Sequence, residues 1–487
     1  MIEILRNKLI LTTLNGRYHH TSLALRYLYA NLDTTHIDCE LLEFTIEDSL
    51  HFIVEKLLAQ SPDYIGFSVA IWNASHTQEV LKVLKTVKPE IKIILGGPEF
   101  ATQSKTHELA RYADFIIEGE GEEILNEILK TKDECSKKIW TAPLLDLSKI
   151  KMPYDLYTAE DLKHRFVYVE TTRGCPYKCA FCLSALAPQV RYFPLELLFQ
   201  EFSKLIERGA KHFKFIDRTF NINSQRAIDI LDYFLPHQDV FLHFEIVPEI
   251  LTEEFIEKAA EFSEGRLQFE MGVQTLTSHV AKKIDRYLDL EKLEKNMRQV
   301  LTTTQAHIHA DLIVGLPSEH FEEIKEGFNR LLKISPHEIQ LGILKLLRGT
   351  PIEKHIADHK MKFSPLPPYE ILENTELDYF TVQSFKRMSR YLDLLLNHGS
   401  FPHLKNYIQT LEDPFSFFWC FSSFAFEKHP QSNGISLKNL KVLLEEFLKT
   451  KALSEEQITE ITSLASNKAR ETKTQHNSRQ IKHSSKG

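Results

Sequence analysis

The sequence is poor in cysteine and has no long apolar run. Its 487 residues contain only six cysteines, far too few for a disulfide-stapled secreted scaffold. No apolar stretch approaches the roughly 20 residues that a membrane-spanning helix needs. The first residues are interrupted by Glu3, Arg6 and Lys8, unlike the apolar region of a signal peptide. These absences predict a cytoplasmic protein with no membrane partner.

Positive charge is not in excess either. Lys and Arg total 59 against 67 Asp and Glu, a formal net charge of −8, so a nucleic-acid partner is not indicated. Apolar residues make up 43% and charged residues 26% of the chain, as in globular proteins. At roughly 150 residues per domain, the length predicts about three domains.

The first 130 residues alternate short apolar runs with amphipathic stretches. Helical patterns occupy 22–32, 49–60 and 76–87. This alternation predicts an α/β domain with a doubly wound, flavodoxin-like parallel sheet that is covered on both faces. The expected strands are 9–14, 39–44, 64–71, 91–97 and 114–121.

Glycines and small polar residues follow these strands, at the edge where doubly wound sheets bind ligands. No loop has the G-x-G-x-x-G spacing, which disfavours a dinucleotide. The runs GGPEF (96–100) and EGEGEE (118–123) resemble loops of cobalamin-binding domains fused to radical enzymes. No D-x-H-x-x-G motif occurs, so the resemblance supplies no histidine ligand for cobalt. It implies cobalamin contacts from Asn15, Ser68, Asn73, Gly96, Gly97, Glu118 and Gly119.

Three of the six cysteines fall within eight residues, in the loop CPYKCAFC. Their spacing is Cys175-x3-Cys179-x2-Cys182. Thiolates ligate iron–sulfur clusters or zinc, but a structural zinc site needs four ligands and no fourth cysteine is near. Three thiols on one tight loop therefore favour a 4Fe-4S cluster with one iron left open.

The sequence around this loop resembles the signature of the radical S-adenosylmethionine (SAM) superfamily. TTRG precedes the first cysteine, and Phe181 stands before the last, where the family places an aromatic beside adenine. The resemblance implies that the open iron binds the amino and carboxylate groups of SAM, and that reduction cleaves SAM to a 5′-deoxyadenosyl radical. It also implies a reductant such as flavodoxin or ferredoxin.

A strand at 165–175 and five further strand-like runs predict a central partial (β/α)6 barrel. Helical stretches such as 195–209 and 321–334 lie between them. The five later strands are expected at 212–217, 240–247, 266–274, 307–317 and 338–347.

Polar residues at the carboxyl ends of barrel strands are candidates for the site. By the family resemblance, Gln274 in GVQT and Asp311 in DLIVGLP bind the ribose or amino-acid part of SAM, and Gly315 shapes the adenine site. The run LRGTPI resembles a P-G-T-P-L segment after the sixth strand, with Arg348 in place of the first proline.

Residues from about 365 onward lack the β/α pattern and predict a C-terminal α-helical domain. Helices are expected over 384–399 and 436–450, and the phenylalanine-rich run 414–426 between them favours core packing over a substrate-pocket lid. Cys420, within that run, is expected to be a buried thiol. The predicted domains are 1–140 (cobalamin-binding), 141–164 (linker), 165–362 (barrel), 363–465 (helical) and 466–487 (disordered polar tail).

The sequence thus predicts a cobalamin-dependent radical SAM enzyme with three cofactors: a 4Fe-4S cluster, SAM and cobalamin. The resemblance favours methyl transfer to an unactivated carbon. A non-methylating radical rearrangement and a non-catalytic cobalamin- or cluster-binding sensor remain alternatives. Methylthio transfer to RNA is disfavoured, because only Cys39 and Cys135 lie upstream of the cysteine loop. Nothing in the sequence identifies the substrate, whether small molecule or macromolecule.

Overall fold

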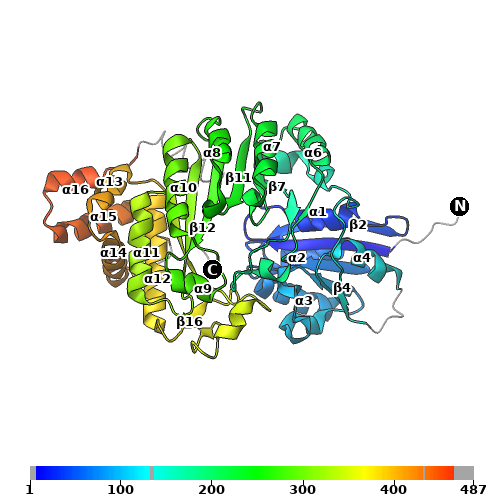
Figure 1. The fold of residues 1–487 in the computed structure, drawn as a ribbon. Coiled ribbons are helices and arrows are strands. Elements are labelled where there is room, and N and C mark those ends of the chain that lie inside the picture. The colour runs from blue at the N-terminus through cyan, green and yellow to red at the C-terminus, as the bar shows by residue number, and fades with distance from the viewer. Residues whose placement is uncertain (1–6, 132–136, 431–433, 466–487) are drawn as a thin grey trace.

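A computed structural model describes residues 7–131, 137–430 and 434–465, so the predicted tail lies outside the described residues. Its N-terminal sheet is six-stranded and parallel, with the order β2-β1-β3-β4-β5-β6 (Figure 1). The strands are β1 (Asn7–Asn15), β2 (Ile37–Thr45), β3 (Tyr64–Ser68), β4 (Lys92–Gly96), β5 (Phe115–Glu118) and β6 (Ile139–Thr141). The expected flavodoxin-like sheet is confirmed, and the short β6 adds an edge strand that the sequence analysis did not assign.

Helices cover both faces of this sheet, as its continuous apolar strands require. On one face α1 (Leu23–Ala30) and α4 (Gly121–Lys130) pack over Leu9, Leu11 and Ile117. On the other face α2 (Leu50–Ala59) and α3 (Ala74–Val87) pack over alternate strand residues such as Ile10 and Ile65. The sheet is therefore doubly wound, as predicted.

The second sheet is also six-stranded and parallel, with the sequential order β14-β13-β12-β11-β10-β7. Sequential order without pairing between the first and last strands makes it an open, partial barrel, which confirms the prediction. Its strands are β7 (Val167–Val169), β10 (His212–Phe215), β11 (Phe241–Ile246), β12 (Leu267–Gln274), β13 (His307–Val314) and β14 (Glu338–Ile343).

Helices enclose the outer face of the barrel, in the centre of Figure 1. Along β12 the residues Leu267, Phe269 and Met271 are buried against helices, while the intervening residues, among them Glu270, point to the interior of the barrel. This period of two follows from the pleat of a strand. The helices are α6 (Leu195–Glu207), α7 (Ser224–Phe234), α8 (Glu253–Ala260), α9 (Ser278–Lys283), α10 (Leu290–Thr303) and α11 (Phe321–Ile334).

The C-terminal region is helical, as expected, and it shares one core with the barrel. Helix α12 (Tyr379–Leu392) packs on β14 and on α14 (Pro414–Lys428). The remaining elements are a two-stranded hairpin, β15 (Lys362–Phe363) with β16 (Ile371–Glu373), and α13 (Pro402–Thr410), α15 (Leu437–Leu448) and α16 (Glu455–Ile461). Among the described residues, no helix is both long and apolar enough to cross a membrane.

The expectation of a buried Cys420 is wrong. Helix α14 buries one face through Phe417, Phe418 and Phe421, spaced three and four residues apart. Cys420 lies on the opposite face and is exposed. The phenylalanines themselves are core residues, as the sequence predicted.

Candidate functional site

The three clustered cysteines lie in a loop over the carboxyl end of the barrel. This cysteine loop, residues 174–190, connects β8 (Thr172–Arg173) to β9 (Arg191–Tyr192), which pair antiparallel. The N–H of Ala180 donates to Ile284 O, and its carbonyl accepts the N–H of Ile352, both at 2.8 Å. Ile284 and Ile352 follow β12 and β14, so the loop is held from both sides of the barrel mouth.

All three cysteines are free thiols, and they fit an iron–sulfur cluster. Cys175 and Cys179 are buried and Cys182 is half-buried. Cys182 Sγ accepts a long hydrogen bond from the N–H of Ser184 at 3.4 Å. No three His, Cys, Asp or Glu side chains in the described ranges are gathered to hold one metal ion. Three soft donors spread along one loop suit a cluster better than mononuclear zinc.

Arg286, which the sequence analysis did not single out, lies beside the cysteine loop. Burial raises the pKa of the Cys179 thiol, and the Arg286 guanidinium opposes that shift. The guanidinium donates to Gly272 O and lies 3.8 Å from Glu249 Oε1. Burial raises the pKa of Glu249, whose side chain is fully enclosed. Arg286 thus supplies positive charge between the thiols and the carboxyl end of β12.

Asp217 fixes the strand that leads into the cysteine loop. Its carboxylate, at the carboxyl end of β10, accepts hydrogen bonds from the Thr171 N–H and from the hydroxyls of Thr171 and Thr172 at 2.6–3.2 Å. Because it is satisfied by these donors and buried at 1% exposure, its role is to hold the loop in place.

The barrel interior carries a row of charged side chains instead of an apolar filling. His243 Nε2 lies 2.9 Å from Glu270 Oε2, and Lys214 Nζ lies 4.0 Å from the same oxygen. Burial lowers the pKa of His243 to about 4. The pKa of Glu270 is lowered as well, because His243, Lys214 and His309 together outweigh burial, which alone would raise it. At neutral pH the carboxylate of Glu270 is therefore ionised and the imidazole of His243 is neutral.

Asp311 lies next to this row, on the same interior face. Its Oδ1 is 3.3 Å from His309 Nε2 but makes no hydrogen bond within the described structure. Burial raises the pKa of Asp311 to about 7, and it raises the pKa of Glu245 on β11 to about 7 as well. Asp311 is half-buried and its Oδ1 accepts no hydrogen bond from the described residues, so this oxygen keeps the capacity to accept the predicted hydrogen bond from SAM.

The other predicted SAM contacts are Gln274 and Gly315 at strand ends and Phe181 in the cysteine loop, whereas Asp311 lies within β13. Gln274 ends β12 with a left-handed φ of 69°, at a register shift against β13. Phe181, in the cysteine loop, is partly buried against the barrel core. Gly315 follows β13, and a Cβ on it would lie 2.6 Å from Ile371 Cγ2. Glycine is therefore required at 315 by the close approach of β16.

The predicted cobalamin contacts gather at the carboxyl edge of the N-terminal sheet, but two are engaged in holding its loops. Asn73 is fully buried; its amide donates to Leu14 O and its carbonyl oxygen accepts the Ala70 N–H. Asn15 is also buried and donates to Glu43 Oε1 at 3.3 Å. These two side chains hold the loops at the carboxyl edge of the sheet, and most of their hydrogen-bonding groups are already used within the protein.

The remaining predicted cobalamin contacts surround the loops after β3, β4 and β5. Gly96 pairs with Ser68 in the register of β4 and β3. A Cβ on Gly97, whose φ is 97°, would lie 2.7 Å from the backbone of Val69, so glycine lets these two loops touch. Glu118 accepts hydrogen bonds from Ser104 N–H and the Thr141 hydroxyl, and Gly119 follows it.

Loops from both sheets meet at their carboxyl ends. Arg173, directly before the cysteine loop, pairs with Glu170 at 2.8 Å and with Glu122 of α4 at 2.7 Å. Arg191, on β9, pairs with Glu120. Burial raises the pKa of Glu170, whereas the pKa of Glu120 is lowered because Arg191 and Arg173 outweigh its burial. These pairs join the EGEGEE loop to the base of the cysteine loop.

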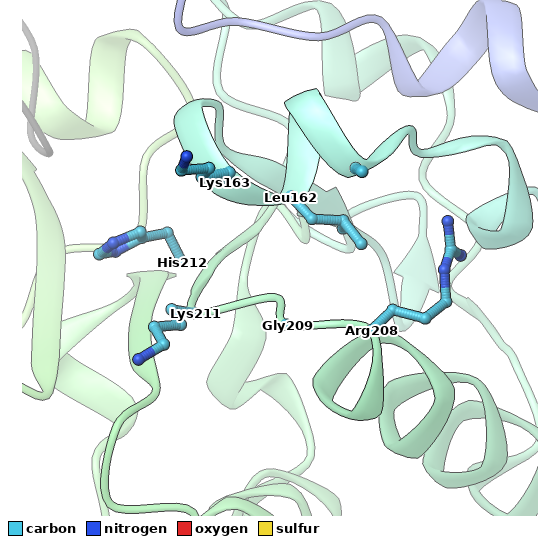
Figure 2. A pocket seen from close by; sticks show the side chains of 7 residues that line it. Leu162, Lys163, Arg208, Gly209, Lys211 and His212 are labelled. Carbon is cyan, nitrogen blue, oxygen red and sulfur yellow. The ribbon is translucent and has the colours of Figure 1, made fainter.

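A separate pocket of about 330 Å³ lies at the other end of the barrel. Figure 2 shows Lys163, Lys211 and His212 on one side of it and Arg208 on the other. It adjoins the amino-terminal end of β10, whereas the cysteine loop lies at the carboxyl ends of the strands. This pocket is therefore not the candidate active site.

Three family models match consecutive parts of the chain. A B12 binding domain matches residues 8–129, and the radical SAM superfamily matches residues 169–331. A protein family of unknown function, DUF4080, matches residues 357–484. The first match covers the doubly wound sheet up to β5 and α4, and the second covers the partial barrel up to α11, short of β14.

The curated relatives include methyltransferases, methylthiotransferases and an anaerobic magnesium-protoporphyrin IX monomethyl ester cyclase. An uncharacterized methyltransferase of Pyrococcus horikoshii is 24% identical over 76% of this chain and 86% of its own length. The cobalamin-dependent radical SAM methyltransferase TokK of Streptomyces tokunonensis is 26% identical over 58% of this chain and 47% of its own length. The chain thus spans about half of TokK.

A solved structure has the same fold over nearly the whole chain. The cobalamin-dependent SAM radical enzyme OxsB, with aqua-cobalamin and SAM bound, covers 94% of this chain and 78% of its own. The TM-score is 0.66 at 15% sequence identity. This likeness extends through the C-terminal helices, and it concerns the fold.

Proposed function

We propose that the chain, which matches family models of a B12 binding domain and of the radical SAM superfamily, transfers a methyl group from SAM to an unactivated carbon of its substrate. The observation that carries the proposal is the contact between the two ligand edges. Arg173, at the base of the cysteine loop, is paired with Glu122 of the B12-binding domain. This contact brings the two edges together, as chemistry that uses both cofactors requires.

Cys175, Cys179 and Cys182 would hold a 4Fe-4S cluster, with SAM at the barrel mouth and cobalamin at the edge of the N-terminal sheet. Bound there, these groups supply radical generation from SAM and a carrier for the methyl group. The electron for SAM cleavage comes from an external reductant, such as a flavodoxin or a ferredoxin.

The protein's own side chains bind and orient SAM. In the proposal Asp311 and Gln274 hydrogen-bond its ribose or amino-acid part, while Phe181 packs beside adenine. The cysteine loop is anchored to both sides of the barrel through Ala180, which keeps the thiols fixed relative to Asp311. A fixed, water-poor site limits the side reactions of a reactive radical.

Asp311→Ala tests the assignment of the SAM site. We expect the affinity for SAM to fall about 10- to 100-fold, the effect of losing a hydrogen bond to a charged group. Equilibrium dialysis with labelled SAM and the oxidised cluster measures it without turnover.

The matched control for this prediction is Asp239→Asn, which changes an 83% exposed carboxylate and should leave SAM affinity unchanged. Equal SAM affinity in Asp311→Ala and wild type would remove Asp311 from the site.

Cofactor loading tests the proposed function at its first step. Protein reconstituted anaerobically with iron and sulfide should retain hydroxocobalamin through gel filtration. With reductant and SAM it should release 5′-deoxyadenosine. Cobalamin retention without any SAM cleavage would favour the non-catalytic sensor instead.

A further inference from the structure

One short segment touches both predicted cofactor sites. This bridging segment, residues 369–374, leads into and includes β16. At one end the hydroxyl of Tyr369 donates to Glu99 Oε2 at 2.9 Å. Glu99 belongs to the GGPEF loop after β4 and is only 2% exposed. Its same oxygen lies 3.2 Å from His107 Nε2, so the contact is a buried three-residue network.

The other end of the bridging segment lies against the predicted SAM site. A Cβ on Gly315 would lie only 2.6 Å from Ile371 Cγ2, so the Ile371 side chain packs directly against the backbone of Gly315. The Asn374 amide donates to Gly315 O at 3.3 Å. The segment is fixed between these ends, because the Leu346 N–H donates to Tyr369 O and the Ile371 N–H donates to Leu344 O.

Neighbouring contacts make the junction with the GGPEF loop stiff. Gln103 Nε2 donates to Glu353 at 3.1 Å, and the same carboxylate accepts the N–H of Gly349 at 2.8 Å. A Cβ on Gly349 would lie 2.1 Å from Thr102 Cγ2. Arg348, the departure from the family's proline, lies over the Tyr369 ring at 5.7 Å. Burial and Glu99 raise the pKa of Tyr369 to about 12, so its hydroxyl keeps its proton at neutral pH.

We propose that the bridging segment couples the binding of SAM to the binding of cobalamin, with Tyr369 as the positioning residue. The proposal rests on the proposed function for the place of each cofactor. SAM that contacts the Gly315 loop favours the arrangement in which this loop packs on Ile371 and Asn374, and through Tyr369 the same arrangement positions the Glu99 loop. Each cofactor then strengthens the binding of the other by the same factor, as linkage requires.

The experiment is a titration of the protein carrying its oxidised cluster with hydroxocobalamin, followed by absorbance, with and without saturating SAM. No reductant is added, so SAM is not consumed. We expect SAM to tighten hydroxocobalamin binding at least fivefold in wild type, within the usual range of such couplings. Tyr369→Phe should reduce the effect to less than twofold, while SAM affinity without cobalamin stays near the wild-type value. Glu99→Gln keeps an acceptor oxygen for the Tyr369 hydroxyl, so it should retain more of the coupling than Tyr369→Phe does.

The control is Tyr379→Phe, a 44% exposed tyrosine at the start of α12, which should leave the coupling intact. If wild type binds both cofactors without mutual effect, or if Tyr369→Phe keeps the full effect, the coupling proposal is overturned and the proposed function stands. If wild type binds no hydroxocobalamin, the proposed function fails and the coupling fails with it.

Discussion

Replacing Cys175, Cys179 or Cys182 with alanine is expected to abolish the iron–sulfur cluster and all SAM cleavage. Each thiol is a free donor on one anchored loop, and none of the described residues completes an alternative metal site with them. Loss of one ligand from three leaves a cluster without a stable attachment. Iron content and visible absorbance after anaerobic reconstitution measure the first effect, and 5′-deoxyadenosine release measures the second.

Cys420→Ala is the matched control for these variants. This thiol is exposed on α14, in the C-terminal helices, and its removal should change neither iron content nor SAM cleavage. Full cluster absorbance in any of the three loop variants would show that the ligands have been assigned wrongly.

Arg173→Met is expected to lower the free energy of unfolding by about 3–5 kcal/mol, the usual cost of breaking a buried ion pair from one side. The arginine pairs with Glu122 and Glu170, and all three side chains are at most 13% exposed. Its removal leaves two buried carboxylates facing each other. Urea denaturation of the protein, followed by circular dichroism, gives the difference in stability.

Arg111→Met, at an exposed position of the B12-binding domain, should cost less than about 0.5 kcal/mol, as surface substitutions usually do. A loss of similar size in the two variants would mean that the Arg173 network does not hold the two edges together.

The fold was predictable because its signals are local. The apolar runs that become β3 and β4 have the length and composition of buried parallel strands. The run CPYKCAFC indicates a cluster through its spacing, the flanking TTRG and Phe181, and the lack of a fourth cysteine nearby. Four phenylalanines of the C-terminal aromatic run are core residues, as predicted, but the exposure of Phe426 and Cys420 depends on which face of α14 meets the barrel. Three-residue β6 was missed because so short a strand is defined by its neighbour, not by its own pattern.

The site was predictable only in part, because its supporting residues are distant in sequence. Arg286 reaches Gly272 and the cysteine loop only once the barrel has formed. Tyr369 and Glu99 are 270 residues apart and carry no motif that links them. Asn73 stood in a loop of the expected type, yet its amide is consumed by backbone contacts. The sequence shows which residue types lie at the carboxyl edge of each sheet. Packing decides which of their hydrogen-bonding groups remain available to a ligand.

The most direct test of the account follows the methyl group of SAM. The reconstituted protein, with cobalamin and reductant, is incubated with methyl-deuterated SAM and a cell extract that lacks this protein, and the products are separated by mass spectrometry. The account predicts a product that carries the labelled methyl on carbon and whose formation requires both cobalamin and the intact cysteine loop. Release of 5′-deoxyadenosine with products that never contain the label would contradict methyl transfer and favour a radical rearrangement.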